Sequence, residues 1–295
     1  MTMINRKQFE EHFISHFDGV DDVLCYKSPH LSYMGGQFGF SFDKKPSGQY
    51  DLVIGEYGEE SPIHPQAKRY HCEQYFLEIM SNYVKDGGKL VAKFPSNFAI
   101  RTLIDKNDKS KKYLYNWINV TDVYVSDGFI IVNIIKEENK HNTKVTYSSG
   151  DVVDIDLENH TILEKYNKEQ YDYIKSACDI KVYDRVPIRP IKRISIAGRS
   201  DDFEKKTKDI DLKNVLFFSH FKSRPTIETI EEVKTTLSTD MFIFESVEER
   251  DRYKDLLKNK KVLDLFNNLC YNIVTSFKVE HKHLIINPQI FNFIQ

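Results

Sequence analysis

The sequence predicts a mixed α/β fold in two domains. An apolar run, an amphipathic segment and a second apolar run follow one another between residues 50 and 95, which is the order of a βαβ unit. Two β-rich runs then meet at Ser126-Asp127-Gly128, and an Asp-Gly dipeptide between apolar strands is typical of a hairpin. Because a charged stretch begins near Glu138, we expect an α/β domain over residues 1–140 and an α+β domain over residues 141–295.

The composition limits the classes of partner. The 295 residues carry 42 basic and 44 acidic side chains, a net charge of −2, so a nucleic-acid partner would need a local basic patch. The four cysteines form no Cys-x-x-Cys pair, which indicates reduced thiols rather than a zinc site or disulfide framework. No run approaches the roughly 18 apolar residues of a membrane span, and the N-terminus lacks a signal-peptide core. We therefore expect a cytoplasmic protein with no membrane partner.

The elements of the first domain follow from periodicity. Phe9, Phe13 and Phe17 recur four apart, which predicts one face of a helix that ends at Gly19. The glycine-rich run from Met34 to Gly39 is interpreted as a turn. The remaining expected elements are a buried parallel strand over 50–55, a helix over 72–84, a strand over 89–95 after the Gly87-Gly88 turn, a helix over 110–118 and the hairpin strands.

The second domain is less regular. Ser246 and Glu249 fit a capping box, so the start of a helix there is well specified. The other expected elements are a hairpin around Ser149-Gly150, a helix over 162–178, a strand over 241–245, and the continuation of the capped helix to 269.

The stretch from Tyr50 to Phe98 resembles the adenine-N6 DNA methyltransferases of restriction-modification systems. In that family a strand ends in an Asp/Asn-Pro-Pro-Tyr/Phe loop, and a helix of the Phe-Leu-Glu type, a Gly-Gly turn and a strand ending in Pro-Ser-Ser/Asn-Phe follow. The matching pieces here are Asp51 to Gly55, Phe76-Leu77-Glu78, Gly87-Gly88 and Pro95-Ser96-Asn97-Phe98. The resemblance implies a partial Rossmann-like methyltransferase domain, closed by the hairpin at 119–136, and a C-terminal region similar to a target-recognition region.

The family's catalytic tetrapeptide would fall on Glu56-Tyr57-Gly58-Glu59. In the family, its Asn or Asp and its two prolines hold the amine of a flipped adenine, and its aromatic residue stacks on the base. Here Glu56 replaces the Asn or Asp, neither proline is present, and Glu59 occupies the stacking position. The longer arm of Glu56 would misplace a geometry that tolerates little error. The resemblance therefore implies a degenerate loop with no catalytic residue.

The family also binds S-adenosylmethionine at a glycine-rich turn between a strand and a helix, followed by an acidic residue that ends the next strand. The run from Met34 to Gly39 lacks a preceding apolar strand and a following helix pattern, and without that context it is a weak signal. We therefore expect the half of the domain that holds the methyl donor to be missing, and no cofactor.

A basic run is the candidate nucleic-acid site. Residues 181 to 199 contain six basic side chains and one acidic side chain, Asp184, and two further basic residues follow His220. Such a patch suits phosphate contacts, and arginine in a groove can read guanine. The alternative is an exposed face balanced by Asp201, Asp202 and Glu204. The predicted residues are Lys181, Arg185, Arg189, Lys192, Arg193, Arg199, Lys222 and Arg224.

No metal site is predicted, because neither His64, His71 and Cys72 nor the pair His281 and His283 has the ligand spacing typical of zinc. The first hypothesis is a catalytically inactive methyltransferase-like protein that binds DNA as a specificity or recognition subunit of a larger complex with protein partners, such as methyltransferase, restriction or transcription machinery. The alternatives are an active adenine-N6 methyltransferase whose cofactor site comes from a partner chain, and a protein–protein interaction factor of anti-restriction type.

Overall fold

The structure is a computed structural model, in which the chain divides into two compact units, Met1–Tyr166 and Asn167–Gln295. The division falls after Tyr166 rather than near residue 140, because the strands over 143–155 join the sheet of the first unit. The residues that the structure describes are 3–43, 45–57, 65–95, 117–138, 140, 142–156, 162–179, 192–196, 200–219, 226–232, 239–270 and 293–294.

The first unit is built on a seven-stranded mixed sheet in the order β1-β2-β3-β5-β4-β6-β7. The three strands β1, β2 and β3 are parallel, β5 is antiparallel to both β3 and β4, and β6 runs parallel to β4. The mixed α/β class expected from the sequence is therefore confirmed. The strands are β1 (Val23–Tyr26), β2 (Tyr50–Glu56), β3 (Val84–Pro95), β4 (Asn119–Ser126), β5 (Phe129–Ile135), β6 (Thr143–Tyr147) and β7 (Val152–Ile155).

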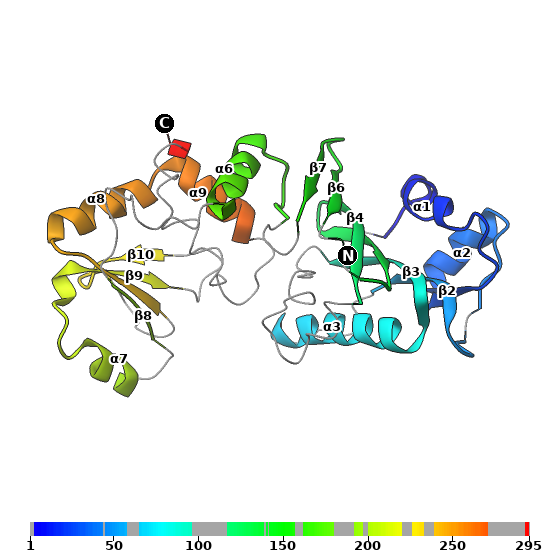
Figure 1. Cartoon of the computed structure of the whole chain (residues 1–295), viewed down its shortest axis with the longest axis horizontal. Helices are drawn as coiled ribbons and strands as arrows, with labels where there is room; N and C mark the ends of the chain where they lie inside the picture. Colours follow the sequence, from blue (N-terminus) through cyan, green and yellow to red (C-terminus); the bar gives the residue numbers. More distant parts are fainter. Residues whose placement is uncertain are drawn as a thin grey trace. The chain divides into compact units, whose positions relative to one another are not determined.

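Helices cover both faces of this sheet (Figure 1). Leu52 and Ile54 of β2 pack against α1 (Arg6–His12) and α2 (Pro29–Gln37). Gly55 points to the opposite face, because a Cβ on it would lie 2.7 Å from the Tyr75 hydroxyl of α3 (Pro65–Asn82). Successive residues of a strand alternate between faces, so α2 and α3 lie on opposite sides of β2.

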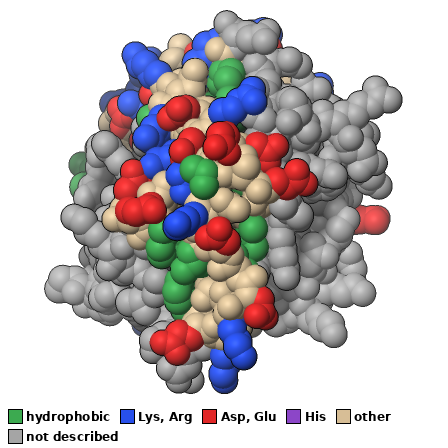
Figure 2. All heavy atoms as spheres, turned by 90° about the vertical axis from the view of Figure 1, so that its left-hand side faces the viewer, with side chains coloured by type: hydrophobic (Ala, Val, Ile, Leu, Met, Phe, Trp, Pro, Cys, Tyr) green, Lys and Arg blue, Asp and Glu red, His purple; other side chains and the backbone are tan. Residues whose placement is uncertain are grey.

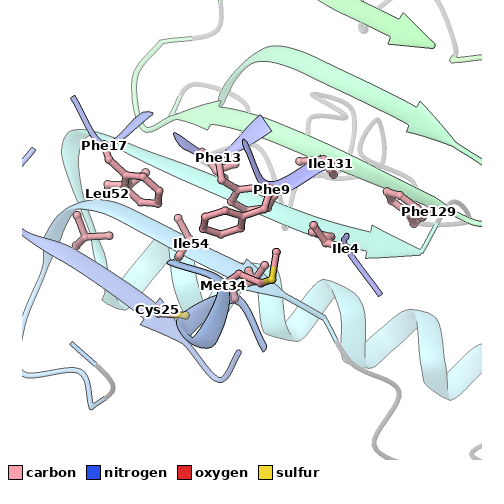
Figure 3. Close-up of a cluster of buried hydrophobic side chains, with 13 residues drawn as sticks. Ile4, Phe9, Phe13, Phe17, Cys25, Met34, Leu52, Ile54, Phe129 and Ile131 are labelled. Atoms are coloured by element: carbon pink, nitrogen blue, oxygen red, sulfur yellow. The ribbon is translucent and has the colours of Figure 1, made fainter. Parts of the chain in front are cut away.

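The expected first helix is present, and its three phenylalanines enter the core. Phe9, Phe13 and Phe17 are buried over Leu52 and Ile54 (Figure 3). The helix is shorter than expected: α1 ends at His12 and a 3-10 turn, η1 (Ile14–His16), continues the chain. Gly19 follows with φ +73°, the left-handed conformation that glycine adopts without a Cβ penalty.

The interpretation of the run from Met34 to Gly39 as a turn is wrong. A buried strand, β1, precedes it, and residues 34–37 form the last turn of α2. Gly35 is needed for packing rather than for a turn, because a Cβ there would lie 2.1 Å from the Phe42 ring. Only Gly39, at φ +84°, has the conformation of a turn glycine.

Both hairpins form as expected. Gly128 (φ +83°) turns β4 into β5, and Gly150 (φ +93°) turns β6 into β7. The second hairpin belongs to the first sheet, because β6 pairs in parallel with β4 through Asp122 to Val125. Parallel pairing between segments separated by a hairpin is a tertiary choice that local periodicity does not encode.

The second unit contains a four-stranded antiparallel sheet in the order β10-β9-β11-β8. Val215, Phe217 and Met241 form its buried cluster, against which Phe203 of α7 packs. The strands are β8 (Lys192–Ile196), β9 (Val215–Ser219), β10 (Thr226–Glu228) and β11 (Thr239–Ile243). The helices are α6 (Lys168–Asp179), α7 (Ser200–Thr207), η2 (Leu212–Asn214), α8 (Val247–Leu257) and α9 (Lys260–Cys270).

Two expected helices of this unit have different limits. The helix expected at 162 begins at Lys168, because the Asn167 side chain accepts the Gln170 backbone N–H at 3.0 Å. The helix capped by Ser246 starts as predicted, since the Ser246 Oγ accepts the Glu249 N–H at 3.2 Å. It ends at Leu257, and Asn259 starts α9 by accepting the Lys261 N–H at 2.9 Å. A second cap inside the run thus divides one expected helix into two.

Candidate site at the carboxyl ends of the parallel strands

The connection that follows β1 and the connection that follows β2 leave the sheet in opposite directions. After α2 the chain returns to the outer edge of β1, where Asp43 forms a single parallel bridge with Leu24. Cys25 N–H and Asp43 N–H make the two bridging hydrogen bonds, at 3.0 and 3.1 Å. The connection β2-α3-β3 instead proceeds away from β1, with its helix on the other face. In open α/β sheets such a switch point places ligands outside the carboxyl ends of the strands.

The end of β1 carries a strained residue in place of a glycine-rich turn. Lys27 has φ +47°, a conformation that is uncommon without glycine. Its ammonium lies 4.8 Å from the centre of the Tyr26 ring and 3.5 Å from the Glu78 carboxylate. Ser28, next in the chain, donates its hydroxyl to the Tyr26 carbonyl at 2.9 Å and accepts the Glu56 N–H at 2.6 Å. These contacts tie the end of β1 directly to the end of β2.

The end of β2 is closed by a buried ion pair. Glu56 Oε1 lies 2.6 Å from the Nζ of Lys93 in β3, and the Lys93 side chain is only 1% exposed. The Lys93 ammonium also lies 5.0 Å from the centre of the Phe129 ring, a favourable cation–π position. Removal of two charges from water is tolerated here because each has the other as a partner. One oxygen of the Glu56 carboxylate is therefore paired with Lys93.

Aromatic side chains fill the α3 side of the same edge. The Tyr75 ring lies 5.5 Å from Tyr26, 5.4 Å from Tyr57 and 6.1 Å from Phe94, measured between ring centres. The Tyr75 hydroxyl donates to the Tyr26 carbonyl at 3.1 Å, and the Tyr26 hydroxyl donates to Glu78. Burial raises the pKa of both Tyr26 and Tyr75, so these phenols stay neutral hydrogen-bond donors. The edge is packed by the chain's own side chains.

The predicted loop is only partly described. Glu56 is the last residue of β2, and the Tyr57 N–H donates to the Lys93 carbonyl at 3.0 Å, whereas Gly58 and Glu59 lie outside the described residues. Of Pro95-Ser96-Asn97-Phe98 only Pro95 is described, and the helix expected over 110–118 also falls outside apart from its last two residues. Sequence reasoning missed Lys93 and Ser28, because neither has a motif and both are placed by strand pairing.

The basic run also lies mostly outside the described residues. Lys192 and Arg193 are in β8, where their backbones pair with Ile243 and Phe242 of β11. Lys181, Arg185, Arg189, Arg199, Lys222 and Arg224 lie outside the described ranges. On the coloured part of Figure 2, Lys and Arg side chains are interspersed with Asp and Glu rather than gathered in a patch of one sign.

Within the described ranges, no three His, Cys, Asp or Glu side chains are placed to share a metal ion. Cys72 is buried in α3, which also contains His71, while His64, His281 and His283 lie outside the described residues. No helix of the described residues has both the length and the apolar character needed to cross a membrane. No protein-family model matches the chain, and a comparison with curated proteins finds no matching relative.

Proposed function

We propose that this chain is a methyltransferase-like protein that does not transfer methyl groups and that binds DNA as a recognition subunit of a larger nucleic-acid-acting complex. The absence of methyl transfer is argued from the Glu56–Lys93 pair at the carboxyl end of β2. A methyltransferase of the resembled family needs a free oxygen acceptor there to hold the adenine amine. Here the acceptor at that position is the longer Glu56 side chain, and one of its carboxylate oxygens is held by the buried Lys93 ammonium, which orients the carboxylate toward β3.

The strand connections of the first unit support the proposal that its fold is methyltransferase-like. The β1-α2 and β2-α3-β3 connections depart in opposite directions with their helices on opposite faces, as in doubly wound Rossmann-like folds. The antiparallel β5 beside β3 and the hairpin with β4 agree with the closing strands that the resemblance implies.

The turn between β1 and α2 does not fit a methyl donor. In the resembled family this turn is glycine-rich, so that the backbone approaches the donor closely. Here it reads Lys27-Ser28-Pro29, and the Ser28 hydroxyl fills the space between β1 and β2 by bonding to Tyr26 and Glu56. Asp43, the acidic residue after α2, accepts the Tyr50 hydroxyl at 3.1 Å. Ser28 and Asp43 each therefore already have hydrogen-bond partners within the chain.

Isothermal titration calorimetry with S-adenosylmethionine tests whether the chain lacks methyl transfer. We expect no binding by the full chain and no transfer of labelled methyl groups to duplex DNA. Tight donor binding by the chain alone would overturn the proposal and favour an active enzyme. Donor binding that appears only after a second protein is added would favour an enzyme whose site is completed by a partner.

Fluorescence anisotropy with a labelled DNA duplex at several salt concentrations tests the proposed DNA binding. We expect affinity to fall steeply with salt, and the variant Arg189→Glu/Lys192→Glu/Arg193→Glu to bind more weakly with a shallower salt slope, by about one unit for each phosphate that is no longer neutralised. The matched control is Lys205→Glu/Lys206→Glu/Lys208→Glu, which also reverses three charges, all exposed, in the last turn of α7 and just after it. Equal weakening by both variants would indicate general electrostatics, and unchanged binding would refute a recognition role for the basic run.

A further inference from the structure

The α1–η1 segment, residues 6–16, is held on the sheet by its side chains. Its backbone hydrogen bonds are local, such as Phe13 N–H to the Phe9 carbonyl at 2.9 Å and His16 N–H to the Phe13 carbonyl at 3.1 Å. Figure 3 shows the phenylalanine rings against the sheet. The ladders from β1 to β4 pair without this segment. The segment can therefore separate while the sheet keeps its hydrogen bonds, a local opening of the kind common near chain termini.

His12, the last residue of α1, packs directly on the sheet. Its ring centre lies 4.0 Å from that of Tyr124 in β4. The His12 Nε2 atom is buried and has no hydrogen-bond partner among the residues that the structure describes. A neutral imidazole tolerates this position by carrying its single proton on Nδ1. An imidazolium carries a proton on both nitrogens, so in the same position it would bury an N–H and a positive charge without an acceptor.

His16, in η1, also fits the sheet as a neutral ring. Its Nε2 lies 2.7 Å from the amide nitrogen of Asn133 in β5, so the amide donates and the imidazole accepts. Protonation of that nitrogen removes the acceptor and sets two donors against each other. Both histidines of the α1–η1 segment therefore contact the sheet in a form that a proton disrupts.

The charged groups near the two rings leave this preference in place. Among the described residues they are Glu11 of α1, Lys89 of β3, Asp122 of β4 and Lys144 of β6. Burial is the largest cause at both rings, and it lowers the pKa of His12 and of His16. Glu11 opposes burial at His12. At His16 the Lys89 ammonium adds to the lowering of the pKa, and Asp122 opposes it. Both imidazolium ions are thus disfavoured while the segment is in place.

We propose that the α1–η1 segment is a proton-sensitive cover, which separates from the sheet in mild acid before the rest of the first unit unfolds, because the sheet offers a protonated His12 no acceptor. Separation exposes the apolar sheet residues beneath the segment, which include Leu52 and Ile54. In the separated segment both rings meet water and titrate near the ordinary pKa of about 6.5, so separation takes up protons. Each histidine should therefore raise the separated population by up to about tenfold for each pH unit below that value, until the pH passes its pKa in the closed state. This behaviour does not depend on DNA or on a methyl donor.

Hydrogen–deuterium exchange of the full chain, followed by mass spectrometry between about pH 5 and pH 8, tests the proposal across the range in which histidine titrates. Each rate is divided by that of an unfolded peptide of the same sequence at the same pH, which removes the intrinsic pH dependence of exchange. We expect the population in which residues 9–16 exchange to rise by about tenfold or more between pH 6.5 and pH 5.5. The amides of β3 and of α8 serve as internal controls and should not change. An equal rise in β3 would mean that the whole unit unfolds, and no rise in residues 9–16 would mean that the segment is not proton-sensitive; either result overturns the proposal.

Variants assign the response to the two rings. His12→Phe keeps an aromatic ring against Tyr124 and should remove the share of the rise that is due to His12. His12→Phe/His16→Gln should remove the rise altogether, because glutamine can still bond to the Asn133 amide but does not titrate.

Two further variants leave both rings in place. Glu11→Gln removes an exposed charge that raises the pKa of His12, so the rise should extend to lower pH. The matched control is His30→Gln, which removes an imidazole of α2 and can still donate to the Ile4 carbonyl, now 2.8 Å from the His30 ring. The proposal is overturned if the double variant keeps the natural pH dependence, or if His30→Gln abolishes it.

Discussion

Replacing Glu56 with glutamine should destabilise the first unit by about 3–5 kcal/mol, the usual result of removing one partner from a buried ion pair. The Lys93 ammonium would then stay buried, with a side chain that is 1% exposed, and would face a neutral amide in place of a carboxylate.

The reverse change, Lys93→Met, should cost less. Glu56 is 12% exposed and can recover part of its hydration, and methionine retains most of the packing volume. The double variant Glu56→Gln/Lys93→Met leaves no uncompensated charge and should be more stable than Glu56→Gln alone. The two substitutions should therefore show a coupling energy of at least about 1 kcal/mol in a double-mutant cycle.

Urea unfolding followed by tryptophan fluorescence measures these changes in the first unit alone, because Trp117 is the single tryptophan of the chain and lies just before β4. The matched control is Asp22→Asn, which breaks the exposed Lys85–Asp22 pair at 2.8 Å and should cost no more than about 1 kcal/mol. If Glu56→Gln and Asp22→Asn had equal effects, or the Glu56 and Lys93 substitutions were additive, the argument for a buried and mutually dependent pair would fail.

Three further predictions use the same unfolding measurement or circular dichroism. Gly35→Ala should cost about 1–3 kcal/mol, because its Cβ would lie 2.1 Å from the Phe42 ring, whereas Gly36→Ala, with open space around it, should be neutral or stabilising; equal effects would exclude the packing explanation. Because the pKa of His12 is lowered in the folded chain, the unfolded chain takes up the proton first as the pH falls. The free energy of unfolding should therefore be unaffected by His12 above about pH 6.5 and should decrease below that value. The part of this pH dependence that is due to His12 should be absent in His12→Phe. Ser246→Ala should cost about 1 kcal/mol by removing the cap of α8, and an unchanged urea midpoint of the second unit would contradict it.

The candidate site was only half visible in the sequence. Glu56 could be placed at the end of a strand because an apolar run precedes it and a polar loop follows. Lys93 could not be identified, since a lysine in a strand is normally an exposed residue, and its burial follows from the register that sets Glu56 opposite it. His12 likewise has no motif, and its isolation depends on how α1 lies over β4 and β5.

The sequence by itself determined the local elements of this protein. The period of Phe9, Phe13 and Phe17, the Asp127-Gly128 turn and the Ser246 cap act within a few residues, so their physics is contained in short segments. Tertiary structure alone decided that the connections after β1 and after β2 leave in opposite directions, that the β6–β7 hairpin extends the first sheet, and which side chains meet at the carboxyl ends of β1, β2 and β3. These outcomes depend on pairing between distant segments, whose hydrogen bonds and buried charges are satisfied only once the sheet is assembled.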